Sequence, residues 1–100
     1  MANEFNIRIL KKAHQDIQNI SKWYDLMEAG LGQIVKQKVR DSINKLAEFP
    51  FFQIRYNDVY CKPLRNFPVT IHYKINEIKR IVSIVAVFHD REDSVKWFRK

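Results

Sequence analysis

The chain has 100 residues, of which 46% are hydrophobic, and it contains only two Gly, three Pro and one Cys. This length suits a single domain, which we expect to cover residues 1–100, and the scarcity of Gly and Pro leaves little room for linkers or disorder. A formal net charge of +7 favours an acidic partner, either nucleic acid or an acidic protein, although solubility alone explains the charge equally well.

Membrane and secreted proteins do not fit the sequence. The longest apolar run, at residues 81–88, is far shorter than the roughly 20 residues that span a bilayer. No hydrophobic signal segment precedes the charged residues Glu4 and Arg8. The single cysteine, Cys61, excludes a disulfide framework. We therefore expect a cytoplasmic protein with no membrane partner.

The first half of the chain predicts one strand and two helices. Alternating apolar residues predict a strand over residues 4–10, and apolar residues at helical spacing predict a helix from Lys11 to Met27. Gly30 is expected as the C′ residue of that helix, because glycine accepts a positive φ. A second helical stripe runs from residue 31 to residue 46, so the two helices should form an antiparallel hairpin.

The second half predicts strands joined by polar turns. Residues 51–56 are extended, and residues 59–64 form a strand in which Pro63 indicates an edge or a bulge. A strand over residues 69–75 alternates apolar and polar residues, and the apolar run at 81–88 is typical of a strand covered on both faces at the centre of a sheet. Ser94 is a candidate N-cap for a short final turn.

These elements predict an α+β fold in the order β-α-α-β-β-β. A helical hairpin should pack on one face of a small, mainly antiparallel sheet.

Short motifs occur in a defined order along the chain. They are Ala13-x2-Asp16-Ile17, Trp23-Tyr24, Gly30-Leu31-Gly32, Leu46-x3-Pro50, Phe67-Pro68, Ile71-x-Tyr73, and His89-x-Arg91 followed by Trp97. Together their order and spacing resemble the RelE/ParE superfamily of bacterial type II toxins. The resemblance implies a small toxin that a cognate antitoxin holds inactive. It also implies one of two targets, DNA gyrase for ParE-like members or messenger RNA on the ribosome for RelE-like members.

The residues that RelE-like nucleases use are only partly present. Such nucleases place lysines on the second strand, arginines early on the third strand and after the fourth, and a tyrosine near the end. Lys62 and Arg91 match two of these positions, but Thr70 replaces the third-strand arginine and Trp97 is the terminal aromatic residue. The indole N–H of tryptophan cannot act as an acid or base at neutral pH.

The end of the chain resembles the ParE-like branch more closely, through His89-x-Arg91 and Trp97. We therefore favour a gyrase inhibitor that acts by binding, and we assign no catalytic residue. Two alternatives stay open. One is a ribosome-dependent endoribonuclease that uses His72 or His89 for proton transfer, and the other is an inactive relative that binds only its antitoxin.

Two sets of residues are candidates for binding. Antiparallel pairing should bring Arg65, His89 and Arg91 together at one end of the sheet. The full set of predicted target-binding residues is Lys62, Arg65, His72, His89, Arg91 and Trp97. The predicted antitoxin-binding residues are Trp23, Tyr24 and Met27, which we expect to be core or antitoxin-contact residues rather than a platform on which bases stack.

Simpler explanations exist for the polar candidates. His72 lies on the polar face of its strand, where plain solvation is an equal explanation, and His89 lies in a charged stretch with Asp90. Cys61 is expected to be a small core residue. The histidines and the cysteine lack the spacing of metal ligands, and no glycine-rich phosphate loop occurs, so we predict neither a metal nor another cofactor.

Overall fold

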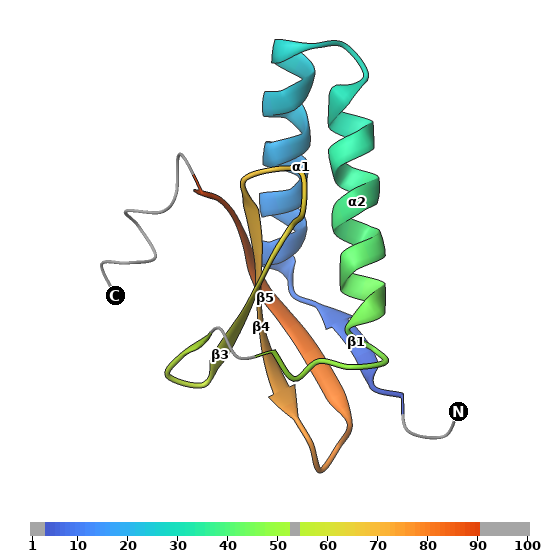
Figure 1. Ribbon diagram of the computed structural model, residues 1–100, viewed down its shortest axis with the longest axis vertical. Coiled ribbons are helices and arrows are strands. Elements are labelled where there is room, and N and C mark those ends of the chain that lie inside the picture. The colour runs from blue at the N-terminus through green and yellow to red at the C-terminus, as the bar shows by residue number, and fades with distance from the viewer. Residues whose placement is uncertain (1–3, 53–54, 91–100) are drawn as a thin grey trace.

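The computed structural model describes residues 4–52 and 55–90 (Figure 1). A helical hairpin lies against one face of a sheet, so the predicted α+β fold is confirmed. The elements are β1 (Asn6–Ile9), α1 (Lys11–Met27), α2 (Leu31–Lys45), β2 (Arg55–Tyr56), β3 (Val59–Pro63), β4 (Val69–Asn76) and β5 (Ile81–His89). The short strand β2 is added to the predicted order. The final turn predicted after Ser94 lies outside the described residues.

The sheet runs in the order β1-β5-β4-β3-β2. Strands β2 to β5 form an antiparallel meander, whereas β1 pairs parallel to β5, with Asn6 opposite Ile81 and Ile9 opposite Ile84. Because β1 and β4 flank β5, this strand lies inside the sheet, as its almost continuous apolar sequence predicted.

The turn between the helices differs in detail from the prediction. We expected Gly30 to be the C′ residue of the first helix, but Glu28 already caps α1 and Gly30 directly precedes α2. Gly30 does have a positive φ of 89°, which glycine adopts without a Cβ clash. The glycine therefore turns the chain into the second helix.

Gly32 allows the two helices to approach closely. A Cβ atom at Gly32 would overlap the carbonyl oxygen of Ser21 and crowd the carboxyl group of Asp25. The Gly32 N–H also donates a hydrogen bond of 2.7 Å to Asp25 Oδ1. This bond satisfies one of the free N–H groups in the first turn of α2.

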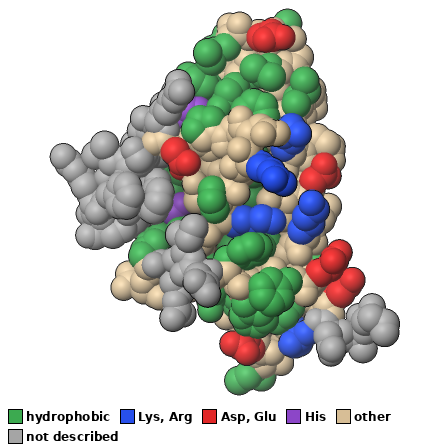
Figure 2. All heavy atoms as spheres, in the orientation of Figure 1, with side chains coloured by type: hydrophobic (Ala, Val, Ile, Leu, Met, Phe, Trp, Pro, Cys, Tyr) green, Lys and Arg blue, Asp and Glu red, His purple; other side chains and the backbone are tan. Residues whose placement is uncertain are grey.

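The tip of the hairpin extends beyond the sheet (Figure 1) and carries apolar surface (Figure 2). Leu26 is 87% exposed and Met27 is 64% exposed at the end of α1. No helix in the described part of the chain is both long enough and apolar enough to cross a membrane.

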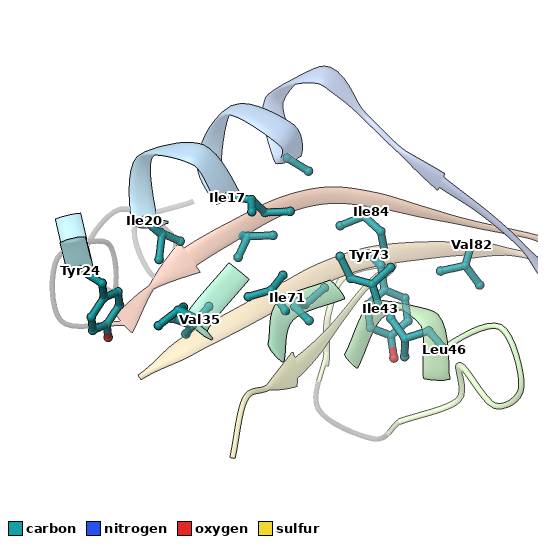
Figure 3. Packing of buried hydrophobic residues seen from close by; sticks show 14 of the residues in the cluster. Ile17, Ile20, Tyr24, Val35, Ile43, Leu46, Ile71, Tyr73, Val82 and Ile84 are labelled. Atoms are coloured by element: carbon teal, nitrogen blue, oxygen red, sulfur yellow. The ribbon is translucent and has the colours of Figure 1, made fainter. Parts of the chain in front are cut away.

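The core fills the space between the hairpin and the sheet (Figure 3). The predicted apolar face of β4 is confirmed, since Val69, Ile71 and Tyr73 have no exposed surface. The Tyr73 hydroxyl donates a 2.7 Å hydrogen bond to the Pro50 carbonyl oxygen and so ties the chain after α2 to the sheet. The other central members are Ile17, Ile20, Tyr24, Val35, Ile43, Leu46, Val82 and Ile84. Burying each such aliphatic side chain contributes roughly 1.5–3 kcal/mol.

The face of β4 that points away from the helices is buried as well. Thr70 is 5% exposed and His72 is fully buried. The hypothesis that His72 is solvated on a polar face is therefore wrong. The side chains of Tyr56, Cys61 and Phe88 pack against the His72 ring.

Candidate functional site

A groove lined by basic residues lies between α2 and the end of β3. It encloses about 390 Å³ and is formed on one side by Lys38, Asp41, Ser42 and Lys45 of α2. The opposite side is formed by residues 62–66, which include Lys62 and Arg65. We call this feature the basic groove. Figure 2 shows Lys and Arg side chains gathered on the same face of the molecule as α2 and the β3–β4 loop.

The register of β3 directs Lys62 into the groove. Lys62 is opposite the core residue Ile71 of β4, so its side chain leaves the sheet on the helical side. The Lys62 Nζ atom makes a long contact of 3.5 Å with the Ser42 carbonyl oxygen. It also lies 5.2 Å from the centre of the Phe52 ring, within the range of a cation–π interaction.

The positive charges of the groove are not neutralised inside the described part of the chain. Lys38, Lys45, Lys62 and Arg65 form no salt bridge there. Burial lowers the pKa of the Lys62 ammonium group, and the nearby charge of Lys45 lowers it further. Ammonium groups held together in this way attract an anionic partner.

Three phenylalanines form an exposed ledge beside the groove. Phe49 is 58% exposed, Phe51 37% and Phe52 36%. The Phe49 ring meets Phe51 and Phe52 edge to face, at centroid distances of 5.7 and 6.1 Å. We call this cluster the aromatic ledge, and Lys62 connects it to the basic groove.

His89 is held in a buried aromatic cluster between α1 and the end of β5. Its Nε2 atom lies 3.0 Å from the Tyr24 hydroxyl, and its ring lies 4.6 Å from the Trp23 ring. Phe67 packs edge-on against Tyr24 at 5.4 Å. Because His89 is only 3% exposed, this cluster orders the end of β5 against α1.

His72 occupies a second buried cluster, on the opposite face of the sheet. The Nδ1 atom lies 3.2 Å from the Tyr56 hydroxyl and 3.7 Å from Cys61 Sγ, and the Phe88 ring packs edge-on at 4.7 Å. Burial, with a smaller effect of Asp90, raises the pKa of the Cys61 thiol to about 11. The thiol therefore stays protonated at neutral pH and is a poor nucleophile, consistent with the predicted core role of Cys61.

Comparison with known proteins now decides the family. The family model described as "ParE toxin of type II toxin-antitoxin system, parDE" matches residues 7–94. This chain belongs to the ParE toxin family. No curated protein matches the sequence significantly.

Solved structures share the fold of this ParE-family toxin. A chain of the chromosomal ParDE system from P. aeruginosa has a TM-score of 0.75 at 12% identity, over 85% of this chain and 95% of that one. A mutant of E. coli RelE in the free state has a TM-score of 0.69 at 15% identity, over 94% and 92%. The intact E. coli RelBE toxin–antitoxin complex contains a chain with a TM-score of 0.63 at 17% identity, over 83% and 93%. At such identities these structures support the fold alone.

The structure of the ParE-family toxin brings together only some of the predicted target-binding residues. Lys62 and Arg65 share the basic groove. The start of β4 lies beside the end of β5, with Val69 opposite His89, but the His89 ring is buried away from the groove. Buried His72 lies on the other face of the sheet. Arg91 and Trp97 lie outside the described residues.

The predicted antitoxin-binding residues divide in a similar way. Tyr24 is buried in the core, Trp23 is half-buried against His89, and Met27 is exposed at the tip of the hairpin. Of the three residues, only Met27 and part of Trp23 are therefore exposed enough to contact a partner directly.

Sequence reasoning missed the contribution of α2 to the groove. Lys38, Asp41, Ser42 and Lys45 recur at spacings of three, four and seven residues, the spacing of one helical face. This polar stripe on one face of the predicted second helix could have indicated that the helix contributes to a binding surface. Among residues 4–52 and 55–90, no group of three His, Cys, Asp or Glu side chains is placed to hold a metal ion.

Proposed function

We propose that this ParE-family toxin inhibits DNA gyrase in the bacterial cytoplasm by binding it, without making or breaking a covalent bond. The observation that carries the proposal is the burial of the two candidate proton-transfer groups. His72 is fully buried and His89 is 3% exposed. A general acid or base must come within about 3 Å of the heavy atom that carries the proton, directly or through one water, and in this conformation neither ring is open to an RNA 2′-hydroxyl group.

The remaining described histidine does not replace them. His14 is exposed on α1 and lines two hollows, one with Lys11 and Lys22 and another with Lys36 and Arg40 of α2, and neither hollow includes a residue of the basic groove. Lys62 and Arg65 therefore have no histidine beside them in the basic groove. The basic groove therefore presents positive charge and a concave shape, and these are sufficient for an inhibitor that acts by binding a protein.

A cognate antitoxin is the second partner in this proposal. The similar solved chains include members of a ParDE system and of a RelBE toxin–antitoxin complex. The exposed apolar side chains of Leu26 and Met27, beside half-buried Trp23, provide a surface that a partner would cover.

A side-by-side assay tests the proposed target. The purified chain is added to gyrase in a supercoiling reaction and, separately, to ribosomes programmed with a defined message. We expect supercoiling to stop while the message stays intact. Message cleavage with unaffected gyrase would overturn the proposal. If the chain neither inhibits gyrase nor leads to message cleavage, and cells that express it alone grow normally, the inactive relative is favoured.

One observation favours the endoribonuclease as the second candidate. The pKa of Lys62 is lowered by burial and by Lys45, and a lysine with a lowered pKa can act as a base. Lys62→Gln keeps the length of the side chain nearly unchanged but removes the titratable group. In the nuclease case this variant would lose message cleavage, and the cleavage rate of the parent chain would rise with pH through the lowered pKa of Lys62.

A further inference from the structure

The basic groove and the aromatic ledge form one continuous surface. Lys62 lines the groove and also lies over the Phe52 ring, and Phe52 contacts Phe49. A partner that reaches the charges of the groove therefore meets an exposed aromatic side chain directly beside them. The two features call for a ligand that carries both negative charge and apolar surface.

We infer that this surface binds an acidic protein segment with an apolar anchor, and that the segment belongs to the toxin's target rather than to its antitoxin. The inference rests on the proposed function, in which the toxin acts by binding a protein. The carboxylates of the segment would face Lys38, Lys45, Lys62 and Arg65, and its apolar side chain would pack on Phe49.

The geometry of the ledge favours a protein segment over nucleic acid. Single-stranded nucleic acids stack their bases on open aromatic faces. Here Phe49 meets its two neighbours at interplanar angles of 73° and 76°, and Lys62 covers Phe52. Pro63 and Leu64 add apolar lining to the groove, and Asp41 adds a negative charge that would oppose a phosphate backbone. An aliphatic side chain can pack on the exposed surface of Phe49 without needing an open, flat ring face.

The character of the surface favours the target over the antitoxin. Long-lived complexes bury more apolar surface than transient ones, whose association depends more on charge. The exposed Leu26 and Met27 provide apolar surface at the hairpin tip. The groove, with four cations that lack a salt bridge in the described part of the chain, suits an electrostatically guided encounter.

Charge reversal in the groove tests the inference. Binding of the purified chain to gyrase is measured for the parent, for Lys62→Glu with Arg65→Glu, and for Phe49→Ser. We expect each variant to bind gyrase roughly tenfold more weakly or worse, because reversed charges repel an acidic segment and serine removes the apolar contact. Asp41→Asn should bind more tightly, since it removes the acidic side chain that lines the groove.

Matched controls separate effects on the groove and the ledge from the effects of changing the net charge or an exposed apolar side chain anywhere on the surface. Lys11→Glu with Lys79→Glu makes the same charge change at exposed positions outside the groove, and Ile78→Ser matches Phe49→Ser at a side chain that is 95% exposed. Both controls should bind gyrase as the parent does. Every variant is also checked for its thermal unfolding midpoint and for binding to the cognate antitoxin, and we expect both to be retained.

The outcomes distinguish failure of the inference from failure of the proposed function. If the parent inhibits gyrase and the groove variants inhibit it equally, the inference is wrong and the proposed function stands. If the groove variants lose the antitoxin but keep gyrase, the occupant is the antitoxin and the inference is wrong. If the parent does not bind gyrase, or if the groove variants lose message cleavage on ribosomes instead, the proposed function is wrong and the assignment of a protein target to this groove is wrong with it.

Discussion

At the scale of single residues, Asp16 connects the first helix to the sheet. The parallel pairing of β1 with β5 ends at Ile9 opposite Ile84. Further along β5, the Val87 N–H donates a 3.0 Å hydrogen bond to Asp16 Oδ2, and Lys12 forms a 2.8 Å salt bridge with the same carboxylate. The Asp16 side chain of α1 thus accepts a hydrogen bond from β5 at a position that β1 no longer reaches.

Removal of the Asp16 carboxylate should destabilise the protein. Asp16→Ala leaves the Val87 N–H without its acceptor, and we expect the free energy of unfolding to fall by about 1–3 kcal/mol. Urea denaturation measures the loss, and Asp16→Asn, which keeps an acceptor, should lose less. Asp58→Ala is the control, because Asp58 makes only a 3.8 Å contact with Lys74 at the surface. Equal losses for Asp16→Ala and Asp58→Ala would contradict the bridging role of Asp16.

The Cys61 thiol makes stability depend on pH. Burial raises the pKa of this thiol from 9.0 to about 11, so the unfolded chain loses the proton at a lower pH than the folded protein does. The folded protein therefore binds more protons between these values, and the free energy of unfolding should fall as the pH rises from about 9 to about 11. Cys61→Ala should make this dependence shallower in denaturation curves recorded from pH 8 upward, and the raised pKa values of Tyr56 and Tyr73 should account for the part that remains. If the free energy of unfolding of the parent and of the variant changed identically with pH, the Cys61 thiol would not be the cause.

At the scale of elements, the close approach of the two helices depends on Gly32. Val35, Val39 and Ile43 can pack into the core only if α2 lies close against α1 and the sheet. A side chain at position 32 meets the backbone oxygen of Ser21, which cannot rotate aside as a flexible side chain would. The helices would have to separate and loosen that core.

Gly32→Ala should therefore destabilise the hairpin. We expect a loss of about 1–3 kcal/mol, the usual cost of overpacking a tight contact. Gly30→Ala provides the comparison, because no atom lies within 4 Å of a Cβ built there and its cost comes only from the positive φ. Chemical denaturation and the helical circular dichroism signal measure both variants. A stable Gly32→Ala protein with unchanged packing would refute the close-contact argument.

The elements were largely predictable from local patterns, and the site was not. Helical and strand periodicity depend on neighbouring residues, so the hairpin and the meander followed from the sequence. The alternation in β4 identified the two faces of the strand correctly, but it could not reveal that the face of His72 is buried too, with Tyr56, Cys61 and Phe88 against the ring. The direction of Lys62 depended on the pairing register of β3 with β4, which a single sequence does not fix.

At the scale of the whole molecule, two surfaces of different character are separated. The tip of the hairpin exposes Leu26 and Met27, and the basic groove lies further down α2, beside β3. A toxin needs to meet an inhibitor and a target, and two such surfaces allow each partner its own chemistry. The net charge of +7 agrees with acidic partners for this chain.

We expect the antitoxin to neutralise the toxin by binding the tip of the hairpin. Leu26→Glu with Met27→Glu places charge on the proposed antitoxin surface, so cells that express this variant together with the cognate antitoxin should stop growing, as we expect with the toxin alone. The control is Ile78→Glu, which changes a side chain that is 95% exposed at the β4–β5 turn and should remain neutralised. Growth curves with and without the antitoxin report the effect. Full neutralisation of the tip variant would place the antitoxin elsewhere.

The proposed toxin acts by binding a protein and not by catalysis. The most direct test titrates the purified chain into gyrase, at a gyrase concentration well above the dissociation constant, and records supercoiling activity. We expect supercoiling activity to fall linearly and to end near equimolar toxin, because each bound toxin inactivates one toxin-binding site of gyrase. Gyrase that stays fully active, while far less than equimolar toxin cuts message on programmed ribosomes, would contradict it.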